Sequence, residues 1–202
     1  MINDDVAVED SSYTTGRRGV AATVIVEKIV GSLAETGGSL KECKILGDKV
    51  NRNSGSMGVA FSSCTVPAAG KPTFKLGSDE MEFGVGIHGE PGRRRDKVQP
   101  AQEITNELLG AIIEDLKLEN NGEILLFVNG MGGTPLTELY LLYDNAKKTL
   151  DNKNIKIARS LVGNYCTSLE MQGASLTITK LDQELKKHWD SPVHTAAMRW
   201  GL

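Results

Sequence analysis

The sequence predicts an α/β protein in which helices cover a layered, partly parallel sheet. Strand-like and helix-like segments alternate between residues 81 and 163, which is the order expected for such layers. A continuous apolar run at residues 124–128 is typical of a strand buried on both faces. Parallel pairing is expected because a helix between two strands lets the second strand run in the same direction as the first.

Two helices are expected near the start of the chain. Residues 17–36 repeat apolar side chains at helical spacing, and a glycine pair ends that helix. Ser39 begins the second helix, with Glu42 three residues later. This spacing is the signature of a capping box, in which each side chain accepts a hydrogen bond from the backbone of the other residue.

A short strand at residues 57–63 and a loop at residues 65–72 are expected next, since two prolines and a glycine interrupt the loop. Two helices and one strand make a poor core by themselves. Residues 1–65 are therefore interpreted as the C-terminal remnant of an incomplete N-terminal α/β domain. Residues 66–202 are expected to form a C-terminal α/β domain with an irregular tail.

Residues 81–88 alternate between apolar and other side chains, which predicts a strand. In that register His88 shares a face with Gly84 and Gly86, so this face is expected to be open and to leave room for a small molecule beside the imidazole. An imidazole can act as base, acid, metal ligand or nucleophile. The alternative is a strand-end histidine bonded to a neighbour, and the pattern leaves both interpretations open.

The second half of the chain continues the alternation. A helix is expected to begin at Pro100, with its apolar residues on one side, and the buried strand follows it. Further strands are expected at residues 155–163 and 175–181. A short helix near residues 182–189 precedes the tail, which Trp189 and Trp200 are expected to dock onto the core.

A glycine-rich turn at residues 129–133 follows the buried strand, with Thr134 expected to cap the next helix and Pro135 at its first position. Backbone N–H groups in such a turn can hold an anion. The alternative is an ordinary turn that needs glycine for its geometry. A P-loop is excluded because the turn carries no lysine at the required position.

Other candidate sites are weaker. Arg93, Arg94 and Arg95 follow His88 closely and either meet a phosphate or acidic partner or form a solvated loop. His188 and His194 flank a short tail segment, but no further residues stand at the spacing of metal ligands, so no metal site is expected.

Composition limits the function classes. The net charge is −3 and aromatic residues make up 5 %, which argues against a nucleic-acid surface. No apolar run reaches membrane-spanning length, and the first ten residues are acidic rather than typical of a signal peptide. The 3 cysteines are far apart, which indicates free thiols in a reducing compartment. The sequence therefore predicts a cytoplasmic protein.

Several blocks together resemble the substrate-binding subunit of the dihydroxyacetone (glycerone) kinase family, in its phosphotransferase-linked type. They are DDVAVEDSSYTTGRRGVAATVIVEKIVG, CTVPAAGKPTF, MEFGVGIHGEPG, NGMGGTPLTELY, NYCTSLEMQGASLTITKLD and WDSPVHTAAMRWG, and they span almost the whole chain. The run GIHGEPG followed by GTPL-ELY and CTSL-M-G is specific to that family. This chain resembles its C-terminal portion.

The resemblance implies that His88 binds dihydroxyacetone covalently, as a hemiaminal between a ring nitrogen and the carbonyl carbon. Gly84 and Gly86, which share a face with His88 in the predicted strand, are expected beside the substrate. It implies that a phosphoryl group reaches the substrate from a partner subunit carrying ADP or ATP and Mg²⁺, and that this chain binds no cofactor itself. It also implies a homodimer that takes part in glycerol metabolism.

The sequence differs from the family pattern near its N-terminus. The family carries acid–base groups on a histidine and an aspartate upstream of the matching region, and residues 1–80 contain no histidine. We therefore expect a shortened chain that keeps the covalent anchor but does not phosphorylate dihydroxyacetone alone. The alternatives are a non-catalytic paralogue that binds dihydroxyacetone as a sensor or co-activator, and a docking domain. The kinase subunit and the paralogue both predict modification of His88 by dihydroxyacetone, whereas the docking domain does not.

Overall fold

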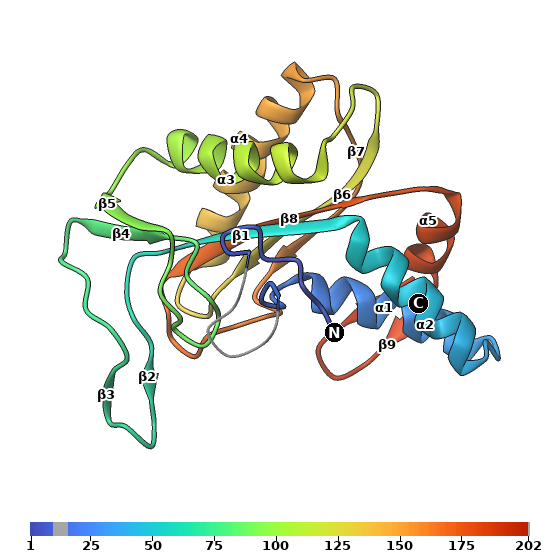
Figure 1. Ribbon diagram of the computed structural model, residues 1–202, viewed down its shortest axis with the longest axis horizontal. Coiled ribbons are helices and arrows are strands. Elements are labelled where there is room, and N and C mark those ends of the chain that lie inside the picture. The colour runs from blue at the N-terminus through green and yellow to red at the C-terminus, as the bar shows by residue number, and fades with distance from the viewer. Residues whose placement is uncertain (10–15, 202) are drawn as a thin grey trace.

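The computed structural model describes residues 1–9 and 16–201. Six strands within these residues form one mixed sheet (Figure 1). They are β1 (Ser54–Ala60), β4 (Glu80–Phe83), β5 (Arg94–Lys97), β6 (Glu123–Gly130), β7 (Lys156–Gly163) and β8 (Gly173–Lys180). Their order is β5-β4-β1-β8-β6-β7; β6 and β7 pair in parallel, and the other neighbours are antiparallel. The α/β class with partial parallel pairing is confirmed.

Helices cover both faces of the sheet. They are α1 (Ala22–Glu35), α2 (Leu40–Arg52), α3 (Ala101–Leu116), α4 (Leu136–Asn152) and α5 (Gln183–Asp190). Figure 1 shows α3 and α4 on one side of the sheet and α1 and α2 on the other. The alternation of β6 explains the two larger core clusters: Leu126 and Val128 pack in the cluster with α3 and α4, whereas Leu125 and Phe127 pack in the cluster with α1, α2 and α5.

Several expected elements are confirmed in type but shifted at their ends. Ser39 accepts a hydrogen bond from the Glu42 N–H and the Glu42 carboxylate accepts one from the Ser39 N–H, so the capping box is confirmed. Pro100 and Pro135 precede their helices as N-caps rather than occupying the first turn. Thr134 does not cap α4, because its hydroxyl donates to the Gly173 carbonyl and accepts from the Gly173 N–H.

Three expectations near residues 65–97 are corrected. The loop at residues 65–72 contains a short hairpin, β2 (Thr65–Val66) with β3 (Lys71–Pro72), which projects from the molecule (Figure 1). The strand expected at residues 81–88 ends at Phe83, because Gly84 turns the backbone to a φ of +75°. Arg94 and Arg95, for which a solvated loop was one of two expectations, lie on strand β5 instead.

Residues on both sides of position 65 contribute to the same sheet. β1 is hydrogen-bonded between β4 and β8, and its Met57 and Val59 side chains belong to the same core cluster as α3. The division of the chain after residue 65 stays a prediction. β1 therefore supports both the N-terminal segment and the loop between β4 and β5.

The tail packs as expected. Trp189 is fully buried, and its ring meets that of Trp200 at 6.0 Å in an edge-on arrangement. The Lys28 ammonium lies 5.2 Å from the first ring and 5.8 Å from the second, and it donates to the Ser191 carbonyl. Across the described part of the chain, the helices are too short or too polar to cross a bilayer.

Candidate functional site

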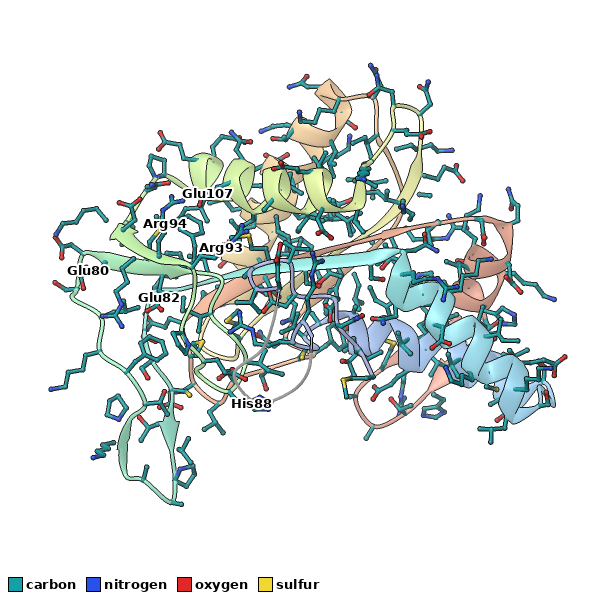
Figure 2. The ribbon with its side chains drawn as sticks, viewed as in Figure 1. Glu80, Glu82, His88, Arg93, Arg94 and Glu107 are labelled. Atoms are coloured by element: carbon teal, nitrogen blue, oxygen red, sulfur yellow. The ribbon has the colours of Figure 1, made fainter. Side chains whose placement is uncertain are left out.

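His88 lies near the tip of the loop that joins β4 to β5. The base of this loop is closed by backbone hydrogen bonds: the Arg93 N–H donates to the Phe83 carbonyl at 2.7 Å, and the Gly84 N–H donates to Gly58 on β1 at 2.6 Å. The His88 side chain is 78 % exposed. Figure 2 shows it on the side of the sheet away from α3. The imidazole is thus presented on a closed loop and is accessible to a small molecule.

The Glu90 side chain contacts His88. One carboxylate oxygen, Oε2, accepts the His88 backbone N–H at 3.0 Å, and the other, Oε1, lies 3.3 Å from the imidazole Nδ1. A carboxylate can only accept hydrogen bonds, so this contact favours the tautomer with the proton on Nδ1 and the lone pair on Nε2. Glu90 was missed in the sequence, although it stands two residues after His88.

The glycines beside His88 do not leave the open face expected from the strand register. A Cβ atom on Gly86 would lie 2.2 Å from Glu90 Oε2 and 3.1 Å from an Arg18 guanidinium nitrogen. A Cβ on Gly84 would lie 2.6 Å from the Ala7 Cβ. These glycines therefore admit the protein's own atoms, and a role of Gly84 and Gly86 in contacting substrate stays a prediction.

The hairpin β2–β3 leads into a segment that supports the tip of the loop. Gly89 has a φ of +77°, and a Cβ there would lie 2.7 Å from Thr73 Oγ1. The Thr73 N–H in turn donates to the Cys64 carbonyl at 3.1 Å. Glycine is therefore required next to His88 for two reasons, the turn itself and the close approach of Thr73.

A buried ion pair stands at the base of the same loop. The Arg18 guanidinium donates from Nε to Asp5 at 2.8 Å, and the two side chains are 7 % and 3 % exposed. It also donates to the Gly84 carbonyl at 2.6 Å and to the Pro91 carbonyl at 3.2 Å. Burial raises the pKa of Asp5 to about 6, against the opposing effect of the Arg18 charge.

The glycine-rich turn after β6 is occupied by the chain itself. The N–H groups of Met131, Gly132 and Gly133 donate to Gly173, to the Asn164 side chain and to Met171 at 3.3, 3.0 and 2.9 Å. A Cβ on Gly132 would lie 1.8 Å from the Leu169 carbonyl oxygen. The geometry supports the interpretation as an ordinary, closely packed turn and gives no support to an anion site.

The arginine run is not a free basic loop. Arg94 pairs with Glu107 of α3 at 2.7 Å and lies 4.9 Å from the centre of the Phe83 ring. Arg95 pairs with Glu82 at 2.9 Å. Figure 2 shows Arg94 and Glu107 together, well away from His88. At two of its three positions, the run is therefore neutralised by acidic partners in this chain.

His188 and the cysteines have structural surroundings, whereas His194 is exposed. His188 is buried, and its Nδ1 lies 3.0 Å from the Ser32 hydroxyl. Cys43, Cys64 and Cys166 are free thiols, and burial raises the pKa of Cys166 to about 11. In residues 1–9 and 16–201, no three histidine, cysteine or acidic side chains gather closely enough to hold a metal ion.

Comparison with known proteins places these features in a family. The chain is 50 % identical over 184 residues, 91 % of its length, to the dihydroxyacetone-binding subunit of the PTS-dependent dihydroxyacetone kinase 1 of Listeria innocua, of which it covers 56 %. It is 43 % identical over its full length to the dihydroxyacetone-binding subunit of the PEP-dependent dihydroxyacetone kinase of Escherichia coli, of which it covers 63 %.

Solved structures with a similar fold come from proteins of dihydroxyacetone kinase systems. A dihydroxyacetone kinase operon co-activator superposes with a TM-score of 0.86 at 32 % identity, covering 95 % of this chain and 59 % of that one. The dihydroxyacetone kinase of C. freundii superposes with a TM-score of 0.82 at 27 % identity, covering 98 % of this chain and 36 % of that one. The chain thus spans about three fifths of the length of the curated subunits that it matches. The model of the Dak1 domain matches residues 1–197, so the chain belongs to the Dak1 domain family.

Proposed function

We propose that this chain binds dihydroxyacetone as the substrate-binding part of a dihydroxyacetone kinase. The observation that carries the proposal is the loop Gly84–Arg93, which presents an exposed histidine whose Nδ1 faces a carboxylate. The relatives that are 50 % and 43 % identical are named as dihydroxyacetone-binding subunits, which supports the same substrate.

The reaction proposed at His88 is addition to the substrate ketone. The Nε2 lone pair attacks the carbonyl carbon, a C–N bond forms, and the C=O π pair moves to oxygen, which takes up a proton. The ring then loses the Nδ1 proton toward Glu90 or water. The sum is a neutral hemiaminal, formed from imidazole and ketone with no other reactant consumed.

Covalent capture explains how a small site can be selective. Dihydroxyacetone and glycerol have the same carbon skeleton and both carry terminal hydroxyls, so hydrogen bonds separate them poorly. Only the ketone has an electrophilic carbon, and only the ketone can add to His88. We therefore expect the chain to retain dihydroxyacetone and to release glycerol.

The phosphoryl group is proposed to come from a partner subunit that carries ADP or ATP with Mg²⁺, while this chain holds neither. Relatives named as PTS-dependent or PEP-dependent support a donor system outside the chain. A homodimer in the cytoplasm is part of the same proposal. In this scheme the hemiaminal presents a terminal hydroxyl of the substrate to the donor.

A second candidate is a dihydroxyacetone-binding co-activator. The structure with a TM-score of 0.86 is named as an operon co-activator, which favours this alternative specifically. Both candidates require capture by His88. They differ in the next step, because only the kinase subunit supports phosphorylation of dihydroxyacetone when its partner proteins are present.

Native mass spectrometry tests the shared step. The wild-type chain incubated with dihydroxyacetone is expected to gain the full mass of one substrate molecule, with no loss of water, as addition requires and imine formation does not. His88→Ala should lose this gain, whereas His194→Ala, which removes an exposed histidine of β9 (Val193–His194), should keep it. Glycerol should give no gain. A wild-type chain that gains no mass from dihydroxyacetone would contradict the proposal.

A further inference from the structure

The loop that carries His88 is held at its stem by one side chain from a distant part of the sequence. Arg18 donates to the carbonyls of Gly84 and Pro91, which lie on the outgoing and the returning limb of the loop. These acceptors are 66 and 73 residues from Arg18 in sequence. The guanidinium therefore spans the two limbs and fixes the distance between them.

Arg18 is itself anchored to the centre of the sheet. Asp5 accepts from Arg18 through Oδ2 and from the Ala7 N–H through Oδ1. The Asp5 backbone forms a bridge to Ser56 on β1, and its N–H donates to the Arg18 carbonyl at 3.1 Å. Contacts thus run without interruption from β1 through Asp5 and Arg18 to the loop.

The connection continues to the reactive group. A Cβ on Gly86 would touch both Arg18 and Glu90, so the guanidinium and the carboxylate approach the loop backbone at the same glycine. Glu90 holds the His88 N–H and faces its Nδ1. A shift of the stem would therefore move Glu90 and change the presentation of the imidazole.

We propose that Arg18, oriented by Asp5, is a positioning residue for His88 and clamps both limbs of the Gly84–Arg93 loop. The effect of this clamp on dihydroxyacetone capture rests on the proposed function, whereas the hydrogen bonds of Arg18 to the loop do not. Only arginine suits the role, because its rigid fork of donors serves two carbonyls and a carboxylate at once, whereas lysine offers a single nitrogen.

The neighbouring residue supplies a matched control. Arg17 also makes a two-pronged ion pair, to Asp115 of α3 at 2.8 and 2.6 Å, and is partly buried. The bonds of its guanidinium go to α3, not to the His88 loop. Arg17→Met therefore removes the same charge from the same segment and spares the clamp.

The experiment compares the wild type with Arg18→Met, Arg18→Lys and Arg17→Met by two measurements. Hydrogen–deuterium exchange follows the loop peptide, and native mass spectrometry follows the equilibrium constant for dihydroxyacetone addition. Both Arg18 variants should exchange faster in the loop and lower the addition constant roughly tenfold or more, since small misplacements of reacting groups have effects of that order. Arg17→Met should match the wild type in both.

Arg18→Lys keeps the positive charge beside Asp5, so it still tests the proposal if Arg18→Met does not fold. A folded Arg18→Lys that matches the wild type would overturn the proposal, as would equal effects from Arg17→Met. Failure of both Arg18 variants to fold would overturn it as well, by showing a general folding role. If the wild type forms no adduct, the proposed function fails, and loop exchange still decides whether Arg18 is the clamp.

Discussion

At the scale of single residues, the site depends on what stands next to the imidazole. Glu90 contacts His88 twice, through the backbone N–H and near Nδ1, while its own side chain is only 10 % exposed. Gly86 permits this arrangement because it leaves space for the carboxylate. In the proposed function these two residues determine which ring nitrogen is free to react.

Glu90→Gln tests the contribution of the carboxylate charge. The amide keeps the size of the side chain but carries no charge, so the ring loses the carboxylate that stabilises its positive charge while the C–N bond forms. Hydrogen bonds to charged groups contribute on the order of 1.5–3 kcal/mol, less near solvent, so the rate of addition should fall roughly threefold to tenfold. Time-resolved native mass spectrometry measures this rate. The control is Glu35→Gln on α1, an exposed carboxylate, and equal rates for the two variants would rule out the role of Glu90.

Gly86→Ala tests the space that the carboxylate occupies. The new methyl group would lie 2.2 Å from Glu90 Oε2 and must displace it. We expect loss of most dihydroxyacetone addition while the thermal midpoint stays close to that of the wild type, because the methyl group would meet the ends of side chains and not backbone atoms. Normal addition by this variant would show that Glu90 need not stand where it does.

At the scale of elements, α1 contains a glycine in its interior. Gly31 lies within α1 with open space where a Cβ would stand. Gly31→Ala should raise the free energy of unfolding by about 0.5–1 kcal/mol, since glycine is the weaker helix former. Urea denaturation measures the change, and a decrease would mean that α1 packs more tightly at that point than described.

Glu123, at the start of β6, links three elements. Lys156 of β7 and Lys186 of α5 donate hydrogen bonds to its carboxylate and lower its pKa from 4.5 to about 2. A lowered pKa in the folded state means that the ionised form is stabilising. That contribution is present above pH 4.5 and is lost as the pH falls toward 2.

Glu123→Gln should therefore lower the thermal midpoint at neutral pH, and the difference from the wild type should shrink as the pH falls through this window. Circular dichroism melts across the window measure the two midpoints. A constant difference at all pH values would show that the ion pairs make no contribution and that the substitution acts through packing alone.

Local signals in the sequence predicted several of these elements, and tertiary contacts decided the rest. The capping box of α2 and the apolar run of β6 involve residues close in the chain, so their patterns were sufficient. The alternation after residue 81 continued through Gly84, where the left-handed turn depends on β1 and Ala7. The clamp of Arg18 was not predictable, because its carbonyl acceptors lie far along the chain.

At the scale of the whole molecule, one sheet connects the N-terminal segment to the rest. β1 lies between β4 and β8, and Asp4, which precedes it in sequence, accepts hydrogen bonds from Val20 and Ala22 at the start of α1. Burial raises the pKa of Asp4, while these hydrogen bonds oppose the change. The buried carboxylate thus fixes the first helix against the centre of the sheet.

This arrangement predicts a single unfolding transition. Trp189 and Trp200 report on the face that α1 and α5 cover, whereas far-ultraviolet circular dichroism reports on all helices and strands. In urea, the two signals should give coincident curves, as expected for one cooperative unit. Two separate transitions would instead support a folding boundary near residue 65.

The most direct test of the central claim is nuclear magnetic resonance on ¹⁵N-labelled chain with dihydroxyacetone labelled with ¹³C at its carbonyl. A covalent hemiaminal predicts a tetrahedral carbon signal with a one-bond coupling to an imidazole nitrogen, absent in His88→Ala. The coupling separates the adduct from the free hydrate of the ketone. Spectra of the wild type that contain only the uncoupled signals of free ketone and hydrate would contradict capture by His88.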